Sequence, residues 1–297
     1  MDNNKAWTGK TGGTKRMQQS LIRIFSHVSP CWLYPLVVLW VIGYIIFSPK
    51  GTKAIYYYWR HIQKRSVLTS CIMLFRNHFE FGKVILDRFA AYSGRQFKVR
   101  IDGEELINRL QQQSGGFIVI SSHIGNQELA GYMNPSKKPM CVLLWTGDTE
   151  TVNTNRERMF NKMGLYFLPI QKDGSHIFAM HEALCRGEIL SIHGDRMFYG
   201  GRTLTASLMG EKADFPEGPY KVAAIEGVPV ITMFMMREKA DSYTLYIREL
   251  ATGREQGDTN KKAVDILNRF ADEMGKILDK YPLQWFHFYQ FWQRQEK

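Results

Sequence analysis

A histidine followed five residues later by a carboxylate is the strongest chemical signal in this sequence. An apolar, β-branched stretch at residues 117–120 has the length expected of a buried strand, and two serines and then His123 follow it. Gly125 and Asn126 then have the character of a turn, and good helix formers follow them. Ligand and catalytic sites of open α/β sheets collect where a strand ends and a helix begins. His123 is therefore a candidate general base, with Glu128 as the acid that orients it.

The spacing of this pair restricts its geometry. Residues five apart on one regular helix do not share a face, so His123 must lie in the turn before the helix for Glu128 to reach it. Glu128 would then hydrogen-bond the imidazole and fix its tautomer. The helix N-terminus would offer backbone N–H groups to a developing oxyanion. The alternative is a strand-end histidine that caps a helix, and spacing alone does not choose between the two.

A second group of polar residues follows another apolar strand. Asp195 and Arg196 come after residues 189–192, so they are expected at the same sheet edge as His123. The guanidinium fork of Arg196 suits a phosphate or a carboxylate, although a structural Asp–Arg pair explains the residues equally well. Arg156 opens a predicted helix, from which it would reach an anionic head group or a phosphopantetheine; a solvated helix face is the alternative.

Several other chemistries lack their sequence signals. The chain has no Gly-x-Ser-x-Gly elbow for a nucleophilic serine. Its histidines have no compact metal-binding spacing, so we expect no metal. The four cysteines are scattered, as expected for reduced thiols in a cytoplasmic setting.

The segments that must position these residues alternate between the two-residue period of strands and the roughly 3.6-residue period of helices. Strands are predicted at residues 96–101, 117–120, 140–145, 165–170, 188–193, 228–235 and 243–250, and helices at residues 104–113, 151–163, 175–185, 216–226 and 259–281. This alternation predicts an α/β fold with a mostly parallel central sheet flanked by helices. We place this domain at residues 93–297 and a basic, helical segment at residues 1–92.

The N-terminal segment carries nearly all the excess charge. Residues 1–76 contain eleven lysines and arginines and one acid, within a net charge of +11 for the whole chain. Residues 31–47 are uncharged, apolar and rich in aromatics, which favours an anionic membrane surface over nucleic acid as the partner. Seventeen residues fit a short span or a helix within one leaflet, and a buried core helix is the third reading. The long polar leader argues against a cleavable signal, and the flanking cations favour the cytoplasmic face.

Taken in order, these blocks resemble the lysophospholipid acyltransferase superfamily, in particular the branch of bacterial late (lauroyl/myristoyl) acyltransferases of lipid A. The resemblance covers nearly the whole chain. The blocks that carry it are His123-x4-Glu128, the Asn155-Arg156 helix, His193-Gly-Asp195-Arg196, Gly227-Val-Pro229 and Tyr281-Pro-x-Gln-Trp285-Phe-x-Phe-Tyr. Phe-Pro-Glu217-Gly looks like a glycerophosphate acyltransferase signature, but it lies at a helix entry, whereas Asp195-Arg196 occupies the expected strand end.

The resemblance implies transfer of a fatty acyl group from acyl carrier protein or coenzyme A to a hydroxyl of a membrane lipid. It implies His123 and Glu128 as catalytic residues, and Asn126, Arg156, Asp195 and Arg196 as substrate-binding residues. No cofactor beyond the acyl thioester and no nucleic acid is expected. The implied location is the inner membrane, with the catalytic domain on its cytoplasmic side. Open alternatives are another lipid acceptor, a thioesterase and an inactive membrane-binding module.

Overall fold

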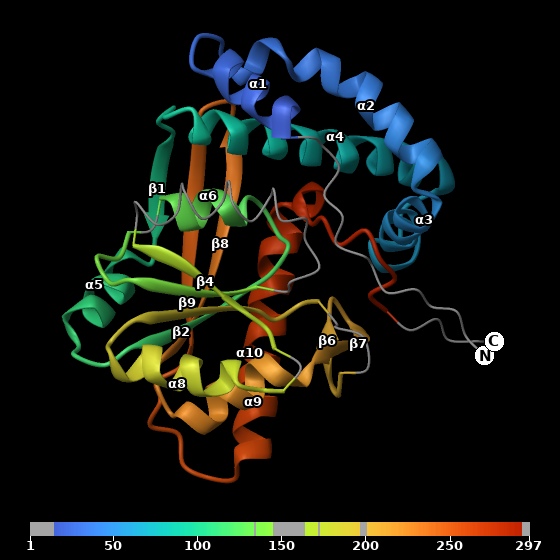
Figure 1. Cartoon of the computed structure of the whole chain (residues 1–297). Coiled ribbons are helices and arrows are strands. Elements are labelled where there is room, and N and C mark those ends of the chain that lie inside the picture. The colour runs from blue at the N-terminus through green and yellow to red at the C-terminus, as the bar shows by residue number, and fades with distance from the viewer. Residues whose placement is uncertain (1–14, 134, 145–163, 172, 197–200, 293–297) are drawn as a thin grey trace.

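The computed structural model describes residues 15–133, 135–144, 164–171, 173–196 and 201–292 (Figure 1). The predicted helix at residues 151–163, which carries Arg156, lies outside these ranges, and so do the first fourteen residues.

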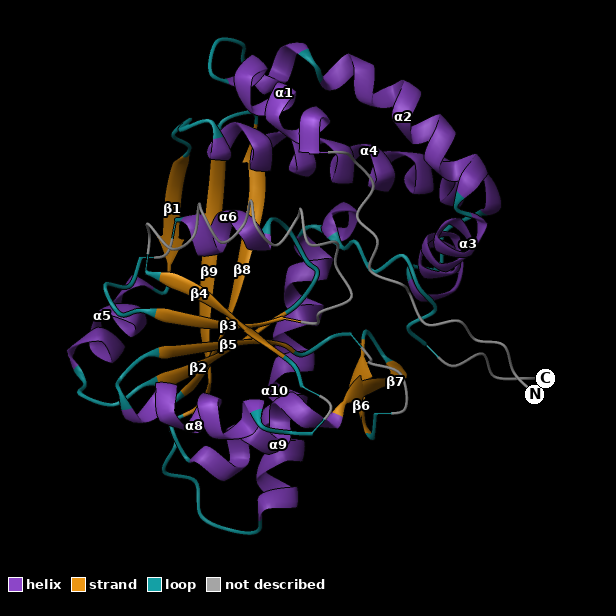
Figure 2. Ribbon diagram, viewed as in Figure 1, coloured by secondary structure: helices purple, strands orange, loops and turns teal. Residues whose placement is uncertain are grey.

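A seven-stranded sheet forms the centre of the described chain. Its strands are β1 (Lys98–Asp102), β2 (Phe117–Ser121), β3 (Met140–Leu144), β4 (Leu165–Pro169), β5 (Ile189–His193), β8 (Val230–Lys239) and β9 (Ser242–Ala251). Their order is β1-β9-β8-β2-β5-β3-β4, and every pairing is parallel except that of β8 with β9. Figure 2 shows the strong twist that turns β1, β8 and β9 away from the direction of the other strands. The predicted mostly parallel sheet is confirmed.

Helices cover both faces of this sheet, as predicted. They are α1 (Lys15–Phe25), α2 (Tyr34–Phe47), α3 (Pro49–Tyr57), α4 (Val67–Tyr92), α5 (Glu104–Gln112), α6 (Gln127–Tyr132), α8 (His176–Cys185), α9 (Glu217–Glu226) and α10 (Thr259–Lys280), with single turns η1 (Pro30–Trp32), η2 (Tyr58–Ile62) and η4 (Pro282–Gln284). Helices α1, α4 and α5 contribute to one hydrophobic core, and α8, α9, α10 and η2 to the other.

Strand β2 shows why the sheet needs two covering layers. Its five residues are all buried. Phe117 and Val119 pack into the core of α4 and α5, whereas Ile118 and Ile120 pack into the core of α9 and α10. A strand that buries both faces has a continuous apolar sequence instead of an alternating one.

An antiparallel hairpin was not predicted from the sequence. Strands β6 (Thr203–Leu208) and β7 (Glu211–Pro216) form a separate two-stranded sheet that packs on α10. Its turn contains Met209 and Gly210, both with positive φ, which glycine adopts without strain. Only its inward side chains, such as Ala206 and Phe215, are buried, so the stretch has no continuous apolar run.

The apolar N-terminal stretch forms α2, which lies along α4 (Figure 1). Val37 and Val41 are buried against it, and a Cβ at Gly82 would lie 2.2 Å from Val37 Cγ1. Among the described residues no unbroken helix has the length and apolar content of a membrane span; residues 34–47 and 49–62 meet that requirement jointly, with a bend of 98° between them.

A buried polar cluster fixes these helices to the sheet. Asp87 of α4 accepts hydrogen bonds from Tyr34 (2.5 Å), Tyr243 (2.5 Å) and Arg237 Nε (2.9 Å). Arg237 also donates to the Tyr34 hydroxyl at 2.9 Å. The cluster joins α2, α4, β8 and β9. The boundary expected near residue 92 therefore separates helices from strands, but both parts share the same cores.

Candidate active site

His123 lies in the turn between β2 and α6, as the spacing argument required. Asn126 precedes the first residue of the helix, and Gly125 has φ +70°. A Cβ at Gly125 would lie 2.2 Å from the Met235 carbonyl oxygen, so only glycine fits this approach to β8. The Asn126 N–H donates to the same carbonyl at 2.8 Å. These contacts fix the turn to β8. The His123 side chain is 22% exposed.

Asp195 is the acid that contacts His123. The imidazole Nδ1 lies 2.8 Å from Asp195 Oδ1, and the His123 backbone N–H donates to Oδ2 at 2.7 Å. The side chain of Asp195 is fully buried. Ser121 pairs with His193 in the parallel register, so His123 and Asp195 each lie two residues beyond a paired position. Neighbouring parallel strands therefore deliver both groups to one sheet edge.

The predicted hydrogen bond between the Glu128 carboxylate and the His123 imidazole is wrong, because the imidazole pairs with Asp195. Glu128 accepts one hydrogen bond from Arg88 Nη1 at 2.8 Å and another from the Tyr92 hydroxyl. It stands on the first turn of α6, which packs against α4, while His123 turns toward the loop after β5. Glu128 follows His123 by only five residues, but α6 directs its side chain to Arg88 and Tyr92 of α4.

Asn126, which was predicted to bind substrate, is buried and caps α6 instead. Its side-chain oxygen accepts from the Leu129 N–H at 3.1 Å, which makes Asn126 the N-cap of α6. Its amide donates to the Tyr243 hydroxyl at 3.4 Å, and the residue is 2% exposed. Helix α6 has six residues, so its dipole is small, and its part in holding an oxyanion stays a prediction.

Arg196 lies close to the pair, whereas Arg156 is outside the described residues. The guanidinium carbon of Arg196 is 5.7 Å from the centre of the Tyr289 ring. A cation at this distance interacts favourably with the face of the ring. The charge of Arg196 acts on the pKa of His123, and its role in holding an anionic group stays a prediction.

The electrostatics of the site keep both partners in the forms that proton abstraction needs. Burial lowers the pKa of His123 below 6.5, and the charge of Arg196 lowers it further, while Asp195 opposes both effects. Burial alone would raise the pKa of Asp195, but the attraction and hydrogen bonds of His123 outweigh it and hold that pKa well below the usual range. At neutral pH the site therefore contains a neutral imidazole beside a carboxylate.

Other residues of the site were missed or left unassigned. The Ser121 hydroxyl lies 2.8 Å from His193 Nδ1, and the rings of His193 and His123 are 4.9 Å apart. The hydroxyls of Tyr220 and Tyr289 donate to the carbonyls of Gly194 and Asp195. His193 stands in the block that marked Asp195, so that signal was present. Tyr289 ends the C-terminal block of the resemblance, which gave it no role, and no spacing pattern connects Tyr220 to the site.

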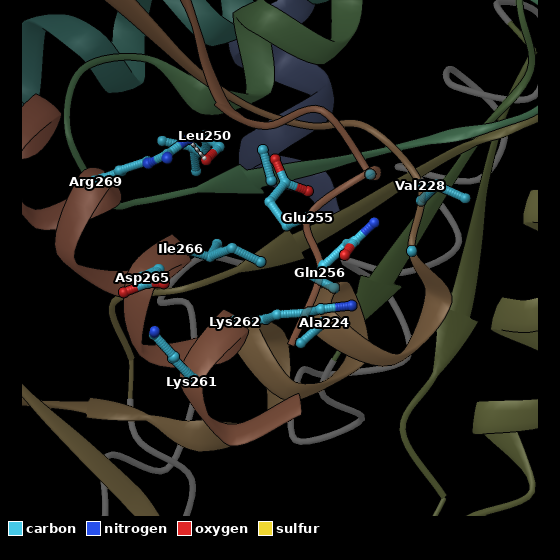
Figure 3. Close-up of a pocket in the computed structure, with 14 residues that line it drawn as sticks. Ala224, Val228, Leu250, Glu255, Gln256, Lys261, Lys262, Asp265, Ile266 and Arg269 are labelled. Carbon is cyan, nitrogen blue, oxygen red and sulfur yellow. Dashed lines mark hydrogen bonds between the residues drawn. The ribbon is translucent and has the colours of Figure 1, made fainter. Parts of the chain in front are cut away.

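A pocket of about 50 Å³ between α9, α10 and the end of β9 is separate from this edge of the sheet (Figure 3). Its lining includes Ala224, Leu250, Lys262 and Arg269, and none of the candidate site residues. A volume of this size holds only a few water molecules and is too small for a fatty acyl chain.

Comparison with known proteins identifies the chain. A family described as bacterial lipid A biosynthesis acyltransferase matches residues 67–294. Among solved structures, the 1-acyl-sn-glycerophosphate (LPA) acyltransferase PlsC from Thermotoga maritima aligns with 92% of this chain and 99% of its own, at 13% identity and a TM-score of 0.42. No curated protein sequence matches. The matched region covers most of the chain, including His123, Asp195 and the C-terminal aromatic residues, so this protein belongs to the bacterial lipid A biosynthesis acyltransferase family.

Proposed function

We propose that this acyltransferase is bound to the inner membrane and moves a fatty acyl chain from an acyl thioester to a hydroxyl of a lipid acceptor of the lipid A type. Acyl carrier protein and coenzyme A are the candidate donors. The observation that carries the proposal is the hydrogen-bonded His123–Asp195 pair at the carboxyl ends of β2 and β5. Membership of the family supports the choice of reaction and acceptor.

The pair supplies a path for one proton. Asp195 accepts the Nδ1–H of His123, which leaves Nε2 with a lone pair. His123 Nε2 takes the proton of the acceptor hydroxyl as its oxygen attacks the thioester carbonyl. The tetrahedral intermediate then expels the thiolate, which receives the proton from the imidazolium. An ester and a free thiol result, and His123 returns to its neutral form.

The remaining predicted residues have binding roles in this proposal. Arg196 stands beside the pair and binds an anionic part of the acceptor or the donor, with Arg156 proposed for a second anionic group. Glu128 supports the reaction indirectly, because its ion pair with Arg88 holds α6, and hence the turn that carries His123, against α4.

The exposed surface of α2 supports binding to a membrane. Large apolar side chains lie uncovered there, including Leu39 (69% exposed), Trp40 (72%) and Phe47 (87%). Cations gather on the adjoining α3 and η2, and Lys53 and Arg60 are both exposed. An apolar surface of this size, next to positive charge, suits an anionic bilayer.

Flotation with vesicles of anionic phospholipid tests this surface. Trp40→Glu should reduce the bound fraction at least tenfold, because it places a charge in the apolar contact. Phe178→Glu is the matched control, since Phe178 is 78% exposed on α8, apart from the proposed membrane surface. If Trp40→Glu and the control bind like the unmodified protein, the proposed membrane surface is wrong.

Product analysis with labelled acyl carrier protein and acyl-coenzyme A tests the reaction, with and without candidate lipid acceptors. Acylated lipid A precursor is the expected product, and His123→Gln should abolish it while the fold is retained. Acylation of a different lipid would replace the proposed acceptor. Free fatty acid as the sole product would indicate a thioesterase, and no use of thioester would indicate a binding module. Lipid mass spectrometry of a deletion strain identifies the acceptor from the species that is lost.

A further inference from the structure

The C-terminal aromatic stretch lies against the active site. We define the C-terminal strap as residues 282–292, which begins with η4. The Gly125 N–H donates to the Gln284 carbonyl at 2.7 Å, and the Phe286 N–H donates to the His123 carbonyl at 3.0 Å. Trp285, fully buried, pairs with Ile124 between these two bonds. The strap therefore holds the backbone on both sides of the His123 turn.

The strap is itself fixed to two other elements. The buried amide of Asn77 in α4 donates to the carbonyls of Leu283 (2.9 Å) and Trp285 (3.1 Å). The Gln284 side chain accepts from the Arg237 N–H at 2.9 Å and donates to the Arg237 carbonyl at 2.8 Å. Four hydrogen bonds thus tie the start of the strap to α4 and β8 and restrict its conformation.

Two tyrosine hydroxyls hold the loop that carries Asp195. Tyr220 of α9 donates to the Gly194 carbonyl at 2.7 Å, and Tyr289 of the strap donates to the Asp195 carbonyl. Tyr220 is fully buried. A Cβ at Gly194 would lie 2.5 Å from Ile120 Cγ2, so the loop is packed directly on β2. The carbonyls of the two peptide bonds on either side of the Asp195 Cα are thus both fixed.

We infer that Tyr289 and Tyr220 are positioning residues that hold Asp195 at hydrogen-bond distance from His123. The strap bonds to the His123 carbonyl through Phe286 and to the Asp195 carbonyl through Tyr289. One fixed segment therefore sets the position of both members of the pair. This inference rests on the proposed function, because it assigns the tyrosines to the reaction that the pair performs.

The reason for such support is the small tolerance of a catalytic pair. Catalytic groups must be held within about 0.5 Å of the productive geometry. A misplacement of 1 Å costs about a hundredfold in rate. Strands β2 and β5 end before either residue, at Ser121 and His193, so the sheet ladder alone does not fix His123 and Asp195.

Tyrosine-to-phenylalanine variants test the inference, because they remove one hydroxyl and keep the ring. Tyr289→Phe and Tyr220→Phe should each lower kcat about tenfold, which corresponds to one hydrogen bond, and should leave KM unchanged. Tyr246→Phe is the matched control: its buried hydroxyl bonds Tyr281 and Lys280, away from the pair, and its loss should change neither constant. Thermal melts establish that each variant is folded.

NMR of ¹⁵N-histidine-labelled protein gives a second result that does not depend on substrate. Asp195 raises the pKa of His123, so loosening the pair should lower that pKa in Tyr289→Phe and leave it unchanged in Tyr246→Phe. A lower kcat with an unchanged pKa, or an unchanged kcat, would overturn the inference. If His123→Gln retains transfer, the proposed function fails instead, and the titration still shows whether the tyrosine fixes the pair.

Discussion

Two carboxylates near the same turn have entirely different surroundings. Asp195 is fully buried and bonds the imidazole of His123, whereas Glu128 is 20% exposed and forms an ion pair with Arg88. The acid that lies 72 residues away contacts His123, and the one that lies five residues away does not. The difference teaches that adjacency of parallel strands decides contact at a sheet edge, while the direction of a helix moves a nearby residue away.

The two carboxylates also predict different consequences when they are lost. Asp195 holds a neutral base in one tautomer, so its loss acts directly on proton transfer. Glu128 joins α6 to α4, so its loss acts on the position of the turn and on stability. Mutations that separate these effects test the comparison.

The largest effect is expected for Asp195→Asn. An asparagine has one side-chain acceptor oxygen, so it cannot accept both the Nδ1–H and the backbone N–H of His123, and the wrong tautomer of His123 becomes populated. We expect kcat to fall roughly 10⁴-fold, as in other His–Asp pairs. Steady-state kinetics on the purified protein measures this, with Asp241→Asn as the control, because Asp241 is a half-exposed partner of Arg95. A loss below tenfold would remove Asp195 from the mechanism.

A smaller effect is expected for the ion pair of α6. Glu128→Gln and Arg88→Gln should each lower kcat about ten- to a hundredfold and the free energy of unfolding by about 2 kcal/mol. The double variant should be no worse than either single one, since one interaction is lost in all three. A double-mutant cycle on both quantities checks this. If Glu128→Gln equals Asp195→Asn while Arg88→Gln is nearly normal, Glu128 acts on His123 directly.

The pH dependence of the reaction sharpens the comparison further. Because burial and Arg196 lower the pKa of His123 below 6.5, kcat/KM should rise with pH along a limb whose midpoint lies below pH 6.5. Arg196→Gln should move this limb to higher pH, since it removes one lowering influence. Glu128→Gln should leave the limb in place. Profiles from pH 5 to 8 measure all three, and a limb in Glu128→Gln displaced like that of Arg196→Gln would contradict the assignment.

The smallest effect concerns the pH dependence of stability that comes from His287 in the strap. Burial lowers the pKa of His287 to about 3. Between pH 3 and 6.5 the unfolded chain binds a proton at this residue that the folded chain does not, so this histidine makes stability fall as pH falls. Its contribution is about 1.4 kcal/mol per pH unit.

Denaturant unfolding of His287→Asn at pH 5 to 6 checks this value. The slope of the unfolding free energy against pH should decrease by about 1.4 kcal/mol per unit relative to the unmodified protein. An unchanged slope would show that His287 is already protonated in the folded state. The same unfolding measurement on Glu128→Gln reports how the Glu128–Arg88 ion pair affects stability.

Much of the fold follows from local sequence alone. The apolar stretch at β2, the glycine of the turn after it and the helix formers of α6 predicted where His123 stands. The apolar strand before Asp195 predicted its place at the same sheet edge. The β6–β7 hairpin was missed because only one of its faces is buried, so its strands lack the continuous apolar run that marks β2.

By itself, the sequence determined the α/β class and the two strand ends that carry polar residues, because periodicity and turn residues act within a few positions. Only the tertiary structure decided that β5 lies beside β2, which brings Asp195 to His123 and leaves Glu128 to Arg88. It also decided that Tyr289 supports the pair. Strand order and the path of the C-terminal strap result from packing between distant segments, and no local spacing encodes them.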